Sequence, residues 1–299
     1  MTNETTVICE GLVWPESPRW HAGELWITEA FAEKSGVRSV SRDGTQTLHI
    51  PVSGGPAGMD FLSDGTAVLA AAFDRKILKR GPEDEVFSTF LDLDGIAAYP
   101  NELIVGPGDR IFIADSGFQV GVDPYQSGRL IVVETDGTAS VLCDELPFPN
   151  GLAITPDGRT LTMAESFAGR LSQFKFGSDN SLLEHYVHVA FDNLGVIEDF
   201  EATFTRKSAP DGICLDEAGN IWVANPLEAK VRCISPTGQQ VDEVVISQGG
   251  IACMLGGQNG TTLFVCTGDP LAMAQQNGRI EIAEVDVRGA GCPRSVIPQ

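Results

Sequence analysis

The chain has few basic residues for its length. Its 299 residues include 20 Lys and Arg against 41 Asp and Glu, a formal net charge of −21. Proteins that bind nucleic acid or an anionic membrane surface neutralise phosphates with basic patches, so this balance argues against both kinds of partner. We interpret the acidic charge as a contribution to solubility, with capture of a cation as the alternative.

Signals for a membrane or an oxidising compartment are also missing. No apolar run approaches the ~18 residues of a membrane-spanning helix, and the opening segment MTNETTVICEGLVW lacks a basic stretch followed by an apolar one. The seven cysteines include no Cys-x-x-Cys pair and fall mostly within apolar strand patterns. Such cysteines are typical of small buried side chains in a reducing compartment. The sequence therefore predicts a cytoplasmic protein.

What the sequence does contain is a repeated β-hairpin pattern. The clearest copy, PDGICLDEAGNIWVAN (210–225), has a turn pair, a short apolar strand, a Gly-containing polar turn and a second apolar strand. Weaker copies occupy residues 15–29, 56–71, 100–115, 149–165 and 250–266. Second hairpins lie between the copies and helix signals are absent, so each unit is expected to supply four antiparallel strands.

Six such units predict an all-β fold, a six-bladed β-propeller forming a single domain over residues 1–299. The units follow one another at intervals of roughly 40–60 residues without a low-complexity linker. The strand-like segment 5–12 precedes the first unit, and we expect it to pair with 278–287 in the last blade and so close the ring. Two stretches lengthen the pattern, 117–127 and 191–209, and each is either a binding wall or an insertion without function.

One position of the repeat carries side-chain oxygens in four of the six copies. The residue after the leading Pro is Glu16, Asn101, Asn150 and Asp211 in the first, third, fourth and fifth copies. Inner strands of a propeller surround its axis, so these four side chains are expected to share one ligand. Two carboxylates and two amides suit a hard divalent cation, calcium in the first place, with magnesium, manganese or zinc as alternatives. Pro-Asn-Gly and Pro-Asp-Gly are also ordinary turn sequences, but carboxylates crowded at an axis are costly without a cation.

A cation at this position would favour hydrolysis of an ester-like bond, because it polarises a carbonyl or phosphoryl oxygen. No Gly-x-Ser-x-Gly motif occurs, and the four histidines lie outside the repeated position, which argues against a serine hydrolase. The catalytic base is then expected in the repeated position itself, with Asp211 in first place and Glu16 as the alternative. The residues expected to contact substrate flank the repeated position or end the second strands: Asn101, Tyr99, Asp115, Ser116, Phe118, Phe148, Glu165 and Phe167.

Five segments carry a family resemblance, in order along the chain: GLVWPESPRW, YPNELIV, FPNGLAITPDGRTL, APDGICLDEAGNIWVAN and IACMLGG. With them the chain resembles, nearly end to end, the family of gluconolactonases, luciferin-regenerating enzymes and senescence-marker proteins (regucalcins). The resemblance implies a six-bladed propeller whose metal is bound by Glu16, Asn150 and Asp211, with Asn101 contacting metal or substrate. It also implies hydrolysis of a small-molecule lactone, with Asp211 acting in catalysis and with calcium or zinc as the metal.

Position 99 departs from the family pattern. Sugar-lactone hydrolases of this family often carry Arg two residues before the Asn of the third repeat, where this chain has Tyr99. Exchange of a cation for an aromatic ring favours a less polar or aromatic lactone over a sugar lactone. Two other functions remain open. One is a phosphotriesterase-like hydrolase, since diisopropyl fluorophosphatase and the paraoxonases resemble this ligand set, and the other is a calcium- or ligand-binding propeller without turnover.

Overall fold

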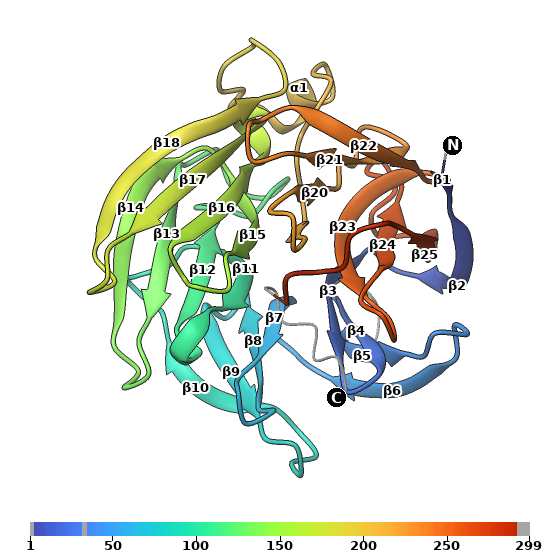
Figure 1. Ribbon diagram of the computed structural model, residues 1–299. Helices are drawn as coiled ribbons and strands as arrows, with labels where there is room; N and C mark the ends of the chain where they lie inside the picture. Colours follow the sequence, from blue (N-terminus) through green and yellow to red (C-terminus); the bar gives the residue numbers. More distant parts are fainter. Residues whose placement is uncertain (1–2, 32–34, 292–299) are drawn as a thin grey trace.

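Six antiparallel sheets surround a central axis in the computed structural model of the chain, which describes residues 3–31 and 35–291 (Figure 1). From the axis outwards, the first three blades consist of β3 (Pro15–His21), β4 (Glu24–Glu29), β5 (Gly36–Val40) and β6 (Gln46–Pro51); β7 (Pro56–Phe61), β8 (Ala67–Ala71), β9 (Lys76–Arg80) and β10 (Ser88–Asp92); and β11 (Pro100–Val105), β12 (Ile111–Asp115), β13 (Gly128–Val133) and β14 (Ala139–Leu146). Each blade begins at the axis with the first strand of one repeat, as predicted.

The other three blades follow the same order. They consist of β15 (Pro149–Ile154), β16 (Thr160–Glu165), β17 (Arg170–Phe176) and β18 (Leu182–Ala190); β19 (Ile213–Leu215), β20 (Ile221–Val223), β21 (Lys230–Ile234), β22 (Gln240–Val245) and β1 (Asn3–Glu4); and β23 (Gly249–Gly256), β24 (Thr262–Gly268), β25 (Gly278–Glu284) and β2 (Thr6–Leu12). The described helical segments are α1 (Phe200–Thr203) and the 3-10 turns Pro107–Asp109 and Ser166–Ala168. The predicted six-bladed propeller is confirmed.

The N-terminal segment contributes strands to two blades. β2 runs antiparallel to β25, which is the pairing that the sequence predicted. β1 was not predicted, and it adds a fifth strand to the neighbouring sheet by pairing in parallel with β22. Trp20 of β3 stacks on Phe264 of β24 with ring centroids 5.1 Å apart, so the first blade packs directly against the last.

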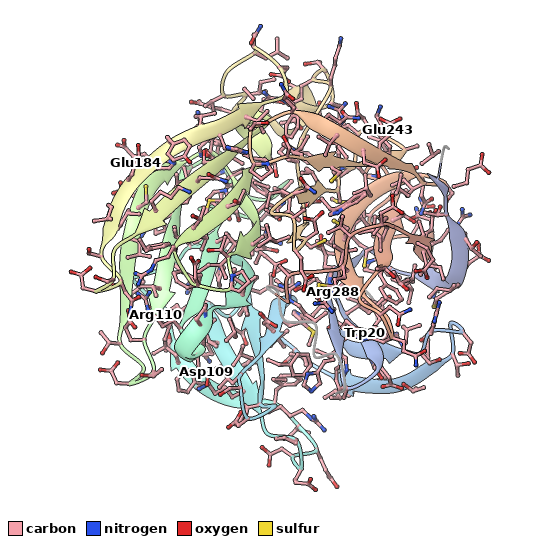
Figure 2. All side chains as sticks on the ribbon, viewed as in Figure 1. Trp20, Asp109, Arg110, Glu184, Glu243 and Arg288 are labelled. Atoms are coloured by element: carbon pink, nitrogen blue, oxygen red, sulfur yellow. The ribbon has the colours of Figure 1, made fainter. Side chains whose placement is uncertain are left out.

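The core consists of apolar layers between neighbouring blades. One layer joins Phe112 of the third blade to Met163 and Phe174 of the fourth, all at most 1% exposed. Successive side chains of a strand point to opposite faces, and both faces of an inner strand are covered by other blades, so the inner strands are almost continuously apolar. Charged side chains such as Glu184 and Glu243 lie instead on the outer strands β18 and β22 (Figure 2).

No helix in the described ranges has the length and hydrophobicity needed to cross a bilayer. Five of the six described cysteines are buried and Cys143 is partly buried, while Cys292 lies outside the described residues.

Candidate active site

The four oxygen-bearing residues of the repeat line one pocket at the axis. A chain of hydrogen bonds runs from Asn101 through Asn150 to the residue before Asp211, across the third, fourth and fifth blades. Asn101 Nδ2 donates to Asn150 Oδ1 at 3.1 Å, and Asn150 Nδ2 donates to Ser166 Oγ at 3.2 Å. Ser166 Oγ then donates to the carbonyl of Pro210 at 2.7 Å, directly before Asp211. The structure thus brings together residues that lie almost 200 positions apart in the sequence.

A glycine after the repeated position allows the inner strands to approach this closely. A Cβ added to Gly151 would lie 2.2 Å from the carbonyl oxygen of Asp211 and 2.7 Å from the backbone nitrogen of Ile213. Real Cβ atoms do not approach backbone atoms to these distances, so any larger residue at 151 must push β15 and the Asp211 segment apart.

Gly151→Ala is therefore expected to destabilise the fold by about 1–3 kcal/mol and to displace Asp211 within the site. Denaturant unfolding checks the first effect and substrate turnover the second. Gly95→Ala is the matched control, because Gly95 has a positive φ of 76° but no heavy atom within 4 Å of an added Cβ, and Gly95 lies outside the residues that line the pocket. The control should lose stability and keep its turnover, and equal losses of turnover in both variants would contradict the prediction.

Two carboxylates, Glu16 and Asp211, line this pocket, and none of the other described lining residues is a Lys, Arg or His. Burial raises the pKa of Glu16 well above its usual range, and the nearby Asp211 and Glu102 raise it further, against a hydrogen bond that Trp14 Nε1 donates to Glu16 Oε1 at 2.8 Å. Burial and Glu102 likewise raise the pKa of Asp211 well above its usual range, against a lowering contribution from the side chain of Asn150. Asp211 Oδ1 is buried and accepts no hydrogen bond from the described residues. Within those residues, no Lys or Arg forms an ion pair with Glu16 or Asp211.

This donor set is one that a hard divalent cation uses. The described residues contain no group of three or more His, Cys, Asp or Glu side chains that could hold a metal ion. A cation at the axis would therefore combine the carboxylates of Glu16 and Asp211 with amide oxygens and water, which is oxygen-only coordination. The buried Asp211 Oδ1 without a hydrogen bond fits such a ligand, because an orphaned carboxylate oxygen is otherwise costly.

Aromatic side chains form the walls of the pocket, which has a volume of about 190 Å³. Tyr99, Phe148 and Phe167, which the sequence predicted as substrate contacts, line it. Phe148 and Phe167 stack with centroids 4.7 Å apart at 13°. Burial and the neighbouring Glu16 raise the pKa of Tyr99 to about 12, so its hydroxyl stays neutral.

Trp14 also lines the pocket, and the sequence analysis did not identify it. The signal was present, because Trp14 stands two residues before Glu16 just as Tyr99 stands two before Asn101. Residues at this offset precede the leading Pro of the repeat and face the same cavity.

Both lengthened stretches contribute to the pocket. Val120 of the 117–127 stretch lines it, and Phe118 of the same stretch is buried behind Phe167, with ring centroids 5.6 Å apart. The 191–209 stretch forms α1, whose Phe200 and Thr203 line the pocket together with Phe204, the residue that follows the helix. No repeat partner exists for α1, so the hairpin pattern could not reveal these residues.

Asp115, Ser116, Phe118 and Glu165 do not belong to the residues that line the pocket, although we predicted them as substrate contacts. Asp115 is fully buried and accepts hydrogen bonds from the backbone nitrogens of Ala98 and Tyr99 at 3.1 and 2.6 Å.

The other two polar side chains of this group are also engaged within the protein. Ser116 Oγ donates to the carbonyl of Tyr99 at 3.3 Å. Glu165 is fully buried, forms an ion pair with Arg170 at 2.8 Å and accepts a hydrogen bond from Ser172. Asp115 and Ser116 thus fix the segment that carries Tyr99, which forms one wall of the pocket. Glu165 connects β16 to β17, the second and third strands of the fourth blade.

Known proteins share this fold and parts of this sequence. Regucalcin from Agrobacterium tumefaciens, described as a calcium-binding protein, matches the structure with a TM-score of 0.79 at 18% identity, over 96% of each chain. Pentonolactonase XacC from Haloferax volcanii is 24% identical over 212 residues, 70% of this chain and 65% of its own length. The gluconolactonase of Zymomonas mobilis is 20% identical over 288 residues, 87% of this chain and 77% of its own length.

The family comparison covers most of the chain. The SMP-30/gluconolactonase/LRE-like region matches residues 14–269, a span that includes Glu16 and the two inner strands of every blade. Fold, repeat and family match agree, and the chain belongs to the SMP-30/gluconolactonase/LRE-like family.

Proposed function

We propose that this protein is a metal-dependent hydrolase of lactones. In this proposal Glu16, Asn150 and Asp211 hold a divalent cation, with Asn101 beside it and calcium as the first choice over zinc, magnesium or manganese. The observation that carries the proposal is the pair of carboxylates, partly buried Glu16 and buried Asp211, which line one pocket without a counter-charge from the described residues. Relatives named pentonolactonase and gluconolactonase support the choice of a lactone as substrate.

The bound cation would supply Lewis-acid polarisation of the lactone carbonyl. Glu16 is held for the ligand role, because Trp14 Nε1 donates to one of its two carboxylate oxygens. Asn150 is similarly held, since it both donates to Ser166 and accepts from Asn101. Preorganised donors of this kind need little reorganisation on binding.

Asp211 is assigned the role of general base. Its carboxylate lies at the floor of the pocket with Oδ1 free of hydrogen bonds from the described residues. In the proposed reaction Asp211 takes a proton from water while the water oxygen forms a bond to the carbonyl carbon. The ring C–O bond then breaks, the leaving oxygen receives a proton, and the product is the hydroxy acid.

Metal removal tests the proposal. Purified protein is analysed for bound elements, exhaustively chelated, and assayed on δ-valerolactone before and after adding back calcium, zinc, magnesium or manganese. We expect chelation to lower turnover at least about 100-fold and one of these metals to restore it, because the described residues that line the pocket include no cation that could polarise the carbonyl. Full turnover after chelation would contradict the metal requirement. Metal binding without hydrolysis of any lactone would favour a calcium- or ligand-binding propeller without turnover. Turnover of paraoxon-type phosphotriesters alone would favour a phosphotriesterase-like hydrolase.

A further inference from the structure

The described residues that line the pocket supply no positive charge to an anionic substrate. Among the described residues that line it there is no Lys, Arg or His, whereas Glu16 and Asp211 both face it. In the metal-loaded protein the two carboxylates balance the proposed divalent cation, so no net positive charge is left to pair with a phosphate, sulfonate or carboxylate on the lactone, and an uncharged lactone is favoured.

The walls also offer few hydrogen bonds to a polyhydroxylated ring. The Ser166 hydroxyl donates to the carbonyl of Pro210, and the Thr203 hydroxyl donates to the carbonyl of Phe200. The indole N–H of Trp14 already donates a hydrogen bond to Glu16. Apart from Tyr99 and the four residues of the repeated position, the remaining described residues that line the pocket are apolar. A sugar hydroxyl buried against them without a partner would cost about 1–3 kcal/mol.

Two further aromatic rings, Phe200 and Phe204, line the same pocket as Glu16 and Asp211. Phe200 and Phe204 contact each other edge to face, with centroids 5.2 Å apart at 78°, and both are only half-buried. They line the same pocket as the stacked Phe148 and Phe167. Rings arranged in this way provide apolar area that a flat or alkyl substituent can cover.

The segment that carries Phe200 and Phe204 is fixed to the wall rather than loosely attached. Arg206 is buried and donates through Nη1 to the carbonyl of Phe167 at 2.5 Å. The same carbonyl accepts from the backbone nitrogen of Ile197 at 2.9 Å. Arg206 also forms an ion pair with Asp192 at 2.8 Å, which ties the two ends of the segment together. The aromatic cover is therefore already formed in the free protein.

From these contacts we infer that the substrate is an uncharged lactone with an apolar substituent, aromatic or alkyl, which packs beneath Phe200 and Phe204. The inference rests on the proposed lactone hydrolysis and names its substrate class. The lactone carbonyl faces Glu16 and Asp211, and the substituent extends between the 191–209 segment and Phe167. A substituent of this kind gains burial against the four rings, whereas a hydroxylated ring gains no comparable contact.

Three lactones with the same six-membered ring test the inference on the metal-loaded protein: unsubstituted δ-valerolactone, 5-phenyl-δ-valerolactone and δ-gluconolactone. We expect kcat/KM for the phenyl lactone to exceed that for the unsubstituted ring about 10-fold and that for gluconolactone at least about 100-fold. Gluconolactone turned over as efficiently as the phenyl lactone would overturn the substrate class and leave lactone hydrolysis standing. If the protein hydrolyses none of the three lactones, both the proposed function and the inference that rests on it are overturned.

Two variants localise the preference. Phe204→Ala should lower the ratio of kcat/KM for the phenyl lactone to that for the unsubstituted ring about 10-fold, mainly through KM. Phe204 is half-buried and follows a four-residue helix, so its truncation should leave the propeller folded. Leu194→Ala is the control, because Leu194 lies on the same segment, is 56% exposed and lies outside the residues that line the pocket. An unchanged ratio in Phe204→Ala, or an equal fall in Leu194→Ala, would overturn the assignment of these rings.

Discussion

Asp211→Asn should lower kcat/KM for lactone hydrolysis by at least about 10³-fold while leaving the propeller folded. The amide has nearly the same shape as the carboxylate, but it cannot accept the proton from water and it is a weaker ligand for a hard cation. Single-residue effects of this size are typical when a base and a ligand are removed together. Steady-state kinetics at saturating metal measure the loss.

The stability of the same variant separates chemistry from folding. Asp211 is 6% exposed, its pKa is raised by burial, and its Oδ1 accepts no hydrogen bond from the described residues. Removing that charge should leave the metal-free protein at least as stable as the parent. Added calcium should raise the melting temperature of the parent but not of Asp211→Asn, because a ligand stabilises only the state that binds it.

Two comparison variants sharpen this expectation. Glu16→Gln should also lose the stabilisation by metal, since Glu16 is the other carboxylate of the site. Asp144→Asn changes an exposed carboxylate on the outer strand β14 and should alter neither turnover nor metal response. Parent-like turnover in Asp211→Asn would exclude Asp211 as the base.

The sequence predicted the floor of the pocket because the repeat fixes both register and radial position. In the copies that begin with Pro, the next residue lies near the start of the inner strand, and the inner strands of successive blades lie side by side at the axis. The residues at this position are therefore expected at the same height along the axis: Glu16, Asn101, Asn150 and Asp211. Tyr99 and Phe148 stand two residues before the repeated position and line the wall of the pocket, and Trp14 stands at the same offset before Glu16. These inferences need only the spacing of the hairpins.

Other parts of the site depend on tertiary contacts that no spacing contains. The sequence could predict where β12 and β16 end. It could not predict that the carboxylate of Asp115 accepts hydrogen bonds from the backbone of Ala98 and Tyr99. Ser116 and Ser166 occupy equivalent positions after these strands, yet Ser166 alone of the two lines the pocket, where it begins a 3-10 turn. The position of α1 is set by the contacts of Arg206, which lies in a segment without a repeat partner.

A second buried charge cluster lies beside the site, and Arg19→Met should destabilise the fold by about 3–5 kcal/mol. Arg19 is 3% exposed in β3, and its Nη2 donates to Glu102 Oε1 at 3.1 Å and to the carbonyl of Leu103 at 2.9 Å. Its Nε lies 3.7 Å from Asp60 Oδ1, on the second blade. One guanidinium thus connects the inner strands of the first three blades.

The expected loss arises from the two buried carboxylates that remain, Glu102 and Asp60. Burial raises the pKa of Glu102, and Arg19 is the main influence that opposes this rise. With Met at position 19, Glu102 must stay charged without its guanidinium or take up a proton, and both cost free energy at neutral pH. Urea unfolding of parent and variant measures the difference. The exposed pair of Arg42 and Glu284 provides the control, because both side chains are more than half exposed and Arg42→Met should change stability by less than about 1 kcal/mol.

The double variant Arg19→Met, Glu102→Gln separates loss of packing from loss of charge pairing. If the unpaired carboxylate causes the instability, neutralising Glu102 should recover a substantial part of it, and the two substitutions should be strongly non-additive. Glu102 also raises the pKa of both Glu16 and Asp211, so its negative charge acts on the pocket itself. Arg19→Met should consequently alter metal affinity as well as stability, since it removes the cation that balances Glu102. Additive effects, or a loss in Arg19→Met no greater than in Arg42→Met, would show that this cluster does not join the blades in the way that its contacts indicate.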